Sequence, residues 1–257
     1  MEKNTSEFIH TMWDELADFD AARADEALTY LMTSLCRIAD SQNAVWIGAV
    51  RVDGCLADDP ARGWRPRAMR FLHASQALDG SAKKQVKDLD EGSIDETTVR
   101  NIALAGRFRA NRLVDLVPES WFDSAYYKTY YRDAGHVDAI WAGAPINEDA
   151  ECYFGVFRDG NHPRFTPEER DLVAYALRGL KWFYRRQMLS HGLMVAASPL
   201  TATEREVIGS LLTGLSEKQI AAARNQSPHT THEYISSIYR KFGVGNRAAL
   251  MALWLGR

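Results

Sequence analysis

The sequence predicts a two-domain protein, in which an α+β domain with helices packed on an antiparallel sheet precedes an all-α domain of four helices. Short apolar, β-rich runs mixed with amphipathic helical patterns predict the first domain over residues 1–190. A series of capped helical segments predicts the second domain over residues 200–257, after a linker at residues 191–199. A length of 257 residues is sufficient for two such domains.

The first domain opens with an amphipathic helix and two strands. Asp25–Asp40 places leucine and methionine side chains at helical spacing, and Ala44–Val50 is apolar on both faces, which predicts a central strand. A long polar insertion, Asp53–Arg67, separates this strand from a second one at Ala68–His73. The stretch Ser81–Glu91 is charged and poorly periodic, and no element is assigned to it.

The rest of this domain combines helices with a hairpin. Ser93–Glu96 is a capping-box pattern that predicts a helix through Ala105. Val137–Ile146 and Glu151–Phe157 are two β-rich runs joined by a short turn, as in an antiparallel hairpin. Thr166-Pro-Glu-Glu169 is a strong helix start, and the apolar spacing after it predicts one long helix that reaches Leu189.

The second domain is organised around Ser216–Phe242, which reads as two helices joined by a tight turn. Ser216 and Gln219 form a capping box, Asn225 suits a left-handed turn, and Ser227-Pro228 starts the next helix. Thr201 and Glu204 predict a preceding helix that stops at Gly214, and Asn246–Leu255 predicts a last one. The outer face of Pro228–Phe242 carries donors, acceptors and cations, which are the groups needed to read a DNA groove.

The runs LTATEREV, GLSEKQIA, SPHTTHEY, IYRKFGV and NRAAL together resemble the LuxR-type helix-turn-helix domain over about Leu200–Leu255. The resemblance implies a four-helix DNA-binding domain that dimerises through its last helix, and therefore a homodimer on double-stranded DNA. Arg224, Gln226 and Thr231 stand where the family has apolar residues, and His232 and Tyr234 where it has lysine and histidine. We therefore expect DNA binding with an altered sequence preference.

The resemblance also assigns roles on the DNA face. The positions that match base-reading residues are His232, Glu233 and Ser236, and a glutamate can accept from cytosine. Phosphate contacts are expected from four residues, Lys218, Thr230, Arg240 and Lys241.

The lack of a leader-peptide pattern and of a membrane-length apolar run predicts a cytoplasmic protein, and the distribution of charge supports DNA binding. The net charge is −3, but Pro199–Arg257 holds seven basic and four acidic residues, so this segment carries +3 and the remainder −6. A locally basic tail fits a sequence-specific DNA-binding protein. There is no leader-peptide pattern and no run long enough for a membrane helix, so we expect no membrane contact. Three widely spaced cysteines favour buried thiols, with a redox switch at Cys55 as the alternative.

Aromatic residues crowd the middle of the chain and predict a small-molecule pocket. Core packing is the ordinary role of such rings, but several tyrosines close together line a cavity more easily than they fill a core. The residues expected to bind the ligand are Trp46, Trp121, Tyr126, Tyr130 and Trp141. The order of elements, with FTPEERDLV before the last helix of the domain, also resembles GAF-like or autoinducer-binding-like sensory domains.

Catalytic, metal and cofactor sites are not predicted. The histidines lack metal-ligand spacing, and the sequence has no glycine-rich phosphate loop and no nucleophile elbow. Two hypotheses remain for the first domain of this DNA-binding regulator. In one, the domain binds a small molecule and controls the DNA-binding domain. In the other, it is a ligand-free module for protein interaction or dimerisation.

Overall fold

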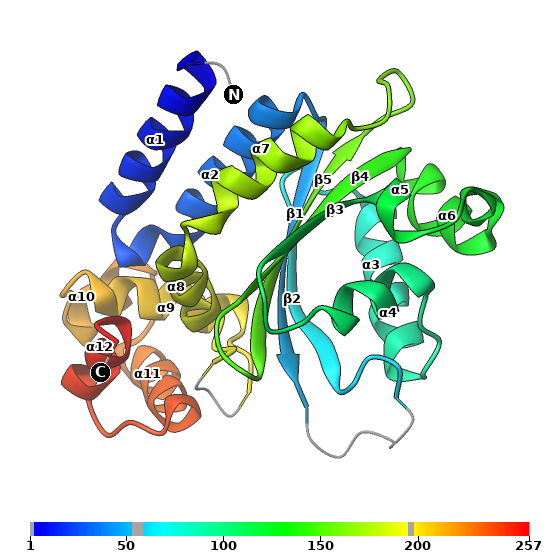
Figure 1. The fold of residues 1–257 in the computed structure, drawn as a ribbon. Helices are drawn as coiled ribbons and strands as arrows, with labels where there is room; N and C mark the ends of the chain where they lie inside the picture. The colour runs from blue at the N-terminus through cyan, green and yellow to red at the C-terminus, as the bar shows by residue number, and fades with distance from the viewer. Residues whose placement is uncertain (1–2, 53–58, 195–197, 257) are drawn as a thin grey trace. The chain divides into compact units, whose positions relative to one another are not determined.

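The computed structural model describes residues 3–52, 59–194 and 198–256 (Figure 1). The chain forms two compact units, Met1–Asp14 with Thr29–Lys181, and Glu15–Leu28 with Trp182–Arg257. The boundaries that the sequence placed at residues 190 and 200 stay a prediction. Cys55 with its redox hypothesis, and positions 195–197 of the predicted linker, lie outside the described residues. Every helix within the described ranges is too short or too polar to cross a bilayer.

The first unit is built on a five-stranded antiparallel sheet with the order β2-β1-β5-β4-β3. Its strands are β1 (Asn43–Arg51), β2 (Trp64–Phe71), β3 (Arg109–Arg112), β4 (Asp138–Pro145) and β5 (Ala150–Arg158). The sheet confirms the predicted α+β class. It also confirms the hairpin, now β4 and β5, and the interior position of the strand at Ala44–Val50. Strand β2 begins at Trp64, inside the segment that was expected to be a polar insertion.

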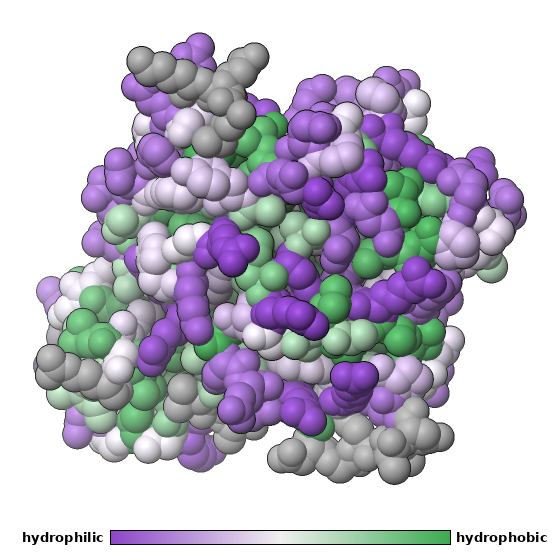
Figure 2. Space-filling view, viewed as in Figure 1, coloured by the Kyte–Doolittle hydropathy of each residue, from purple (hydrophilic) through white to green (hydrophobic). Residues whose placement is uncertain are grey.

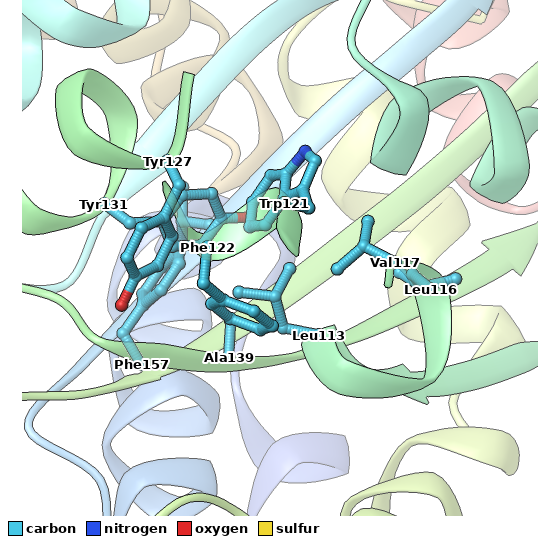
Figure 3. Close-up of a cluster of buried hydrophobic side chains, with 10 residues drawn as sticks. Leu113, Leu116, Val117, Trp121, Phe122, Tyr127, Tyr131, Ala139 and Phe157 are labelled. Carbon is cyan, nitrogen blue, oxygen red and sulfur yellow. The ribbon is translucent and has the colours of Figure 1, made fainter. Parts of the chain in front are cut away.

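Helices cover both faces of this sheet (Figure 1). In Figure 1, α2 and α7 lie on one side, and α3, α4, α5 and α6 lie on the other. The helical elements are α1 (Lys3–Asp18), η1 (Ala21–Arg23), α2 (Ala24–Ala39), α3 (Gln76–Asp90), α4 (Glu96–Ala103), α5 (Leu113–Leu116), η2 (Glu119–Asp123), α6 (Ala125–Tyr130), η3 (Arg132–Ala134) and α7 (Pro167–Arg178). A large cluster of buried rings and aliphatic side chains, drawn in Figure 3, fills the space between α5, α6 and the sheet.

Three local expectations are corrected. Helix α3 covers the charged stretch for which no element was predicted. The cap of α4 is Asp95, whose carboxylate accepts from Thr97 N–H, and not Ser93. The single helix expected from Thr166 to Leu189 is divided at Gly179 into α7 and α8 (Lys181–Ser190), although Thr166 and Glu169 do form the capping box at its start.

An ion pair buried in the sheet joins the edge strand β3 to β5 across β4. Arg109 donates to both carboxylate oxygens of Glu151, at 3.1 and 2.8 Å, and to Tyr153 Oη at 2.9 Å. Gly143 on β4 lies between them, and a Cβ at this position would meet the Arg109 guanidinium carbon at 2.6 Å. Only glycine therefore leaves room for Arg109 to cross β4.

The second unit contains α8 and four helices that match the predicted second domain. These are α9 (Ala202–Leu212), α10 (Glu217–Ala223), α11 (Pro228–Phe242) and α12 (Arg247–Trp254). Their core consists of the buried side chains Val207, Ile208, Leu211, Ile220, Ile235, Ile238, Phe242 and Leu250. Within the same unit, Arg205 on α9 pairs with Asp25, and Gln187 on α8 donates to the backbone oxygen of Ala24 at 2.7 Å.

Candidate functional site

The first candidate site is the outer face of α11, which local sequence signals position. Ser216 and Gln219 cap α10 reciprocally, and Ser227 Oγ accepts from Thr230 N–H at 3.0 Å at the start of α11. Asn225 lies between the helices with φ of 50°, in the left-handed conformation expected of it. These caps and the turn define where α10 ends and α11 begins.

One face of α11 is buried, so its opposite face is directed to solvent. Ile235 and Ile238 are at most 1% exposed and belong to the core of the second unit, and Phe242 closes the end of this face. Burying an isoleucine side chain contributes about 1.5–3 kcal/mol. This packing fixes the rotation of α11 about its own axis and therefore determines which side chains a partner can reach.

The seven residues predicted to contact DNA all lie at least partly exposed on α10 and α11. Lys218, His232, Glu233 and Arg240 are exposed, and Thr230, Ser236 and Lys241 are half-buried. Two of them pair with exposed side chains. His232 Nδ1 lies 3.1 Å from the carboxylate of Glu217, and the carboxylate of Glu233 lies 3.5 Å from His229 Nε2. Exposed pairs of this kind contribute at most about 1 kcal/mol. A phosphate or base edge can therefore replace either partner at low cost.

Lys241 and Arg240 differ in how their charges are used. Lys241 Nζ donates to Glu204 at 2.7 Å and to the backbone oxygen of Pro199 at 3.0 Å. Ser237 Oγ donates to the same carboxylate at 2.8 Å. Burial alone would raise the pKa of Glu204, but the hydrogen bonds from Lys241, from the Thr201 backbone and from Ser237 outweigh it and lower the pKa to about 2. A phosphate contact by Lys241 would have to compete with this carboxylate.

Arg240, by contrast, makes no ion pair within the described part of the chain, and its side chain is exposed. Its guanidinium is therefore the cation of α11 that is most available to a phosphate oxygen.

The polar residues that depart from the family pattern are accommodated in two ways. Arg224 pairs with Glu206 on α9 and also donates to Gln226 Oε1 at 3.4 Å. Thr231 is fully buried, and its hydroxyl has no hydrogen-bond partner among the described residues. An unsatisfied buried hydroxyl costs about 1–3 kcal/mol.

The second candidate site is a cavity in the first unit, between the sheet and the helices α3, α4 and α6. Its volume is about 120 Å³. The walls combine apolar strand residues with aromatic rings and a few polar groups. They consist of Ile47, Ala49, Trp64, Arg65, Pro66, Met69, Gln85, Leu89, Thr97, Thr98, Asn101, Ile102, Tyr126, Tyr131, Trp141 and Tyr153. A smaller hollow adjoins it and shares Gln85, Tyr131 and Trp141.

Most polar groups of this cavity are already paired. Gln85 donates to the hydroxyl of Tyr126, and Tyr153 accepts from Arg109. Burial raises the pKa of all three cavity tyrosines, Tyr126, Tyr131 and Tyr153, so their hydroxyls stay protonated.

Asn101, Tyr131 and Tyr126 are polar groups of the cavity that are not fully paired within the described residues. The oxygen of the Asn101 side chain is buried and has no partner among the described residues, and this residue is only 7% exposed. The hydroxyl of Tyr131 accepts from Trp141 Nε1 at 3.0 Å, and no acceptor for its own hydrogen occurs in the described ranges. The cavity therefore offers the Asn101 oxygen as an acceptor and the Tyr131 hydroxyl as a donor, beside the Tyr126 hydroxyl, which accepts from Gln85 and also has no acceptor for its hydrogen among the described residues.

The structure distributes the five residues predicted for the ligand over different places. Tyr126 and Trp141 line the cavity, and Tyr130 lines the adjoining hollow. Trp121 is instead packed in the aromatic cluster of Figure 3, where its Nε1 donates to Asp95 at 2.9 Å. Trp46 is fully buried on the other face of the sheet, because successive residues of a strand alternate and Ile47 is the one that faces the cavity.

The polar residues of α3 and α4 were missed by the sequence analysis. Gln85, Thr98 and Asn101 line the cavity from these helices. The sequence carries no clear signal for Asn101, since Thr97, Thr98 and Arg100 precede it and a polar residue there is typical of a solvated helix face.

Comparison with known proteins identifies the second unit by sequence. Residues 198–254 match the family model of bacterial regulatory proteins of the luxR family. The probable HTH-type transcriptional regulator GfsR of Streptomyces halstedii is 39% identical over 57 residues, which are 22% of this chain and 24% of that protein. The probable transcriptional regulatory protein SgaR of Hyphomicrobium methylovorum is 43% identical over 54 residues, 21% of this chain and 26% of that protein.

The chain thus matches only about a quarter of the length of these relatives. A structure of SdiA in complex with octanoyl-rac-glycerol is similar over 97% of this chain and 94% of that chain, with a TM-score of 0.50 and 12% identity. At this identity the likeness concerns the fold alone. The sequence match, the caps of α9 to α11 and the left-handed turn at Asn225 agree with one another, and residues 198–254 form a LuxR-family helix-turn-helix domain.

Proposed function

We propose that the protein is a sequence-specific DNA-binding transcriptional regulator that works in the cytoplasm, with a sensory domain at residues 1–190, a linker at residues 191–199 and the DNA-binding domain at residues 200–257. The observation that carries the proposal is the hydrophilic outer face of α11, held in place by a fully buried inner face within a LuxR-family domain. A helix presented in this way has the shape and the donors needed to enter a major groove.

Within that face, base reading is assigned to His232, Glu233 and Ser236. Phosphate contacts are assigned to Lys218, Thr230, Arg240 and Lys241, of which Arg240 is the most available because Lys241 is held by Glu204. Glu233 is the specificity residue of greatest interest, since a carboxylate accepts from the amino group of cytosine.

We further propose that the first unit senses a small molecule in the cavity between the sheet and α3, α4 and α6. An unpaired, buried Asn101 in a cavity wall supports a ligand rather than a ligand-free interaction module, because a buried polar atom without a partner costs free energy that a ligand donor would restore. The fold neighbour SdiA was solved with a small molecule, octanoyl-rac-glycerol. Control of DNA binding requires the ligand to favour one arrangement by about 1–3 kcal/mol.

A homodimer formed through α12 completes the proposal. Met251 and Leu255 are exposed by 37% and 77%, and Figure 2 shows apolar side chains over α12, among other apolar patches on the face in view. Two copies joined at this helix would present two α11 helices to successive half-sites.

The test is selection of bound duplexes from a random pool by the full-length protein, with and without cell extract. Enrichment of a sequence with twofold symmetry supports DNA reading by a dimer, and a change of enrichment with extract supports sensing. A pool that stays random at low salt in both arms would rule out the DNA-binding function. The variant Arg240→Ala is the matched control, because it should weaken binding without changing the selected sequence.

A further inference from the structure

The walls of the cavity restrict what kind of ligand it can accept. The ionic side chain among them is Arg65, which is held by Asp59 at 3.1 Å and by Asp90 at 3.2 Å. A charged ligand would thus be buried without an uncommitted counter-charge, which is strongly unfavourable. The cavity therefore selects an uncharged molecule.

Size and shape narrow the choice further. A volume of about 120 Å³ is close to that of engineered cavities of about 150 Å³ that hold a benzene ring. Aromatic rings line it on several sides, contributed by Trp64, Tyr126, Tyr131, Trp141 and Tyr153. Aromatic walls favour a flat ring, which can stack or pack edge to face against them.

The unpaired groups of Asn101 and Tyr131 then determine which hydrogen-bond donor and acceptor the ligand needs. Asn101 Oδ1 needs a donor, and the hydrogen of the Tyr131 hydroxyl needs an acceptor.

We propose that the cavity binds a compact, uncharged, planar ring compound whose N–H or O–H donates to Asn101 and whose carbonyl or ring acceptor receives the hydroxyl hydrogen of Tyr131. This inference rests on the proposed sensory function of the first unit and names the ligand class of the same site. It gives the unpaired amide of Asn101 a purpose, since the ligand would provide the partner that the protein does not.

The experiment measures dissociation constants of four probes with the full-length protein by ligand-observed NMR. Indolin-2-one has the proposed ring, donor and acceptor, 1-methylindolin-2-one lacks the donor, and indole-2-carboxylate is charged. Octanoyl glycerol is neutral but flexible and not planar. One neutral hydrogen bond corresponds to about a 3- to 10-fold change in affinity, so we expect indolin-2-one to bind that much more tightly than its methylated analogue.

A pair of variants tests the role of Asn101 directly. Asn101→Leu removes the unpaired amide, so the melting temperature should rise while the affinity for indolin-2-one falls to that of the methylated probe. Asn111→Leu is the matched control, because Asn111 Nδ2 is also buried without a partner but does not line the cavity. Its affinity for indolin-2-one should equal that of the wild type. If Asn101→Leu fails to fold, the two indolinones compared on the wild type still decide the question.

The possible failures separate the ligand class from the sensory function. Tighter binding of the carboxylate, of octanoyl glycerol or of the methylated probe would overturn the ligand class, as would unchanged affinity in Asn101→Leu. If the ligand class is overturned but cell extract raises the melting temperature of the wild-type protein, the proposed sensory function stands. If neither the extract nor any probe changes it, both proposals are overturned.

Discussion

The interiors of the two units differ in how tightly they are packed, although each holds buried polar atoms without a partner, such as Asn101 Oδ1 in the first unit and Thr231 Oγ1 in the second. In the second unit, which holds the helix-turn-helix domain, Ile220, Ile235 and Ile238 are at most 1% exposed. The buried carboxylate of Glu204 in the same unit accepts hydrogen bonds from three residues. The first unit, which holds the sheet, instead contains a cavity whose wall includes Asn101, and the side-chain oxygen of Asn101 has no partner among the described residues. The same chain packs tightly where a recognition helix must hold one orientation, and leaves space and an unpaired polar group where we propose that a ligand binds.

Truncation of core side chains should give the largest difference between the two interiors. Ile238→Ala leaves a void in a solid core and should lower the free energy of unfolding of that unit by about 2–5 kcal/mol. Ile47→Ala borders an existing cavity and removes fewer contacts, so the loss should be about half as large. Urea unfolding followed by circular dichroism measures both. Equal losses would mean that the cavity is as tightly packed as the helical core.

The ion pair of the helical unit gives the next largest effect, and it depends on pH. Because the folded pKa of Glu204 lies near 2, below its ordinary value of 4.5, its stabilisation is fully present above pH 4.5 and is lost as the pH falls toward 2. Glu204→Gln should lower the free energy of unfolding at pH 7 by about 2–3 kcal/mol.

The difference between Glu204→Gln and the wild type should shrink steadily as the pH is lowered from 4.5 toward 2. The control is Glu206→Gln, since the Glu206 side chain is 64% exposed and its pair with Arg224 should contribute about 1 kcal/mol or less. A loss in Glu204→Gln that is the same at every pH would show that charge is not what stabilises α9 against α11.

On the DNA face, Glu233 and Arg240 should behave differently. Glu233→Ala should relax the preference at one base pair by about 1–3 kcal/mol. Arg240→Ala should weaken binding to every duplex and reduce the slope of affinity against salt by about one ion. Fluorescence anisotropy with the selected duplex and its single-base variants at several salt concentrations measures both. If the two variants lose the same affinity on all duplexes, the assigned roles are wrong.

The smallest effect concerns Thr231, a buried polar residue of the helical core that resembles Asn101 in having no partner for its side-chain oxygen. Thr231→Val replaces a fully buried hydroxyl without a partner by a methyl of similar size. We expect the free energy of unfolding to rise by about 1 kcal/mol, with unchanged DNA binding. A decrease in stability would indicate that the hydroxyl is paired, and the contrast with the unpaired Asn101 would then be sharper.

The helix-turn-helix unit could be predicted almost completely because its signals are local. Capping boxes, a proline at the first turn of α11 and an asparagine at the left-handed turn each act over three or four residues, and tertiary packing agrees with all of them. What could not be predicted was how the polar residues would be satisfied. Arg224 found its partner on α9, which is distant in sequence.

In the sheet unit, the missing element has a physical explanation. Helix α3 buries only Leu78 and Leu89, because much of its inner side faces hollows rather than a solid core, so the sequence shows little apolar periodicity. The opposite error occurred after Thr166, where periodicity continues through Gly179 although the helix does not. The spacing of apolar residues indicates which side chains are buried. It is misleading where a helix has few buried residues, or where buried residues continue past the end of a helix.

The candidate ligand site was predicted only in part, for a similar reason. Tyr126 and Trp141 line the cavity as expected, but nothing in a strand that is apolar on both faces shows which face is hollow, so Trp46 could not be separated from Ile47. Asn101 was missed because its unpaired state depends on neighbours that only the fold brings together.

The glycine on β4 has a mechanical consequence. Arg109 passes over Gly143 to reach Glu151, so the ion pair connects the edge strand β3 to β5, which is not its neighbour in the sheet. Separation of β3 from β4 therefore requires more than breaking the backbone hydrogen bonds between them. The buried guanidinium of Arg109 would have to leave the carboxylate of Glu151 at the same time. A four-residue edge strand, short enough to fray by itself, is thereby made to open and close together with the middle of the sheet.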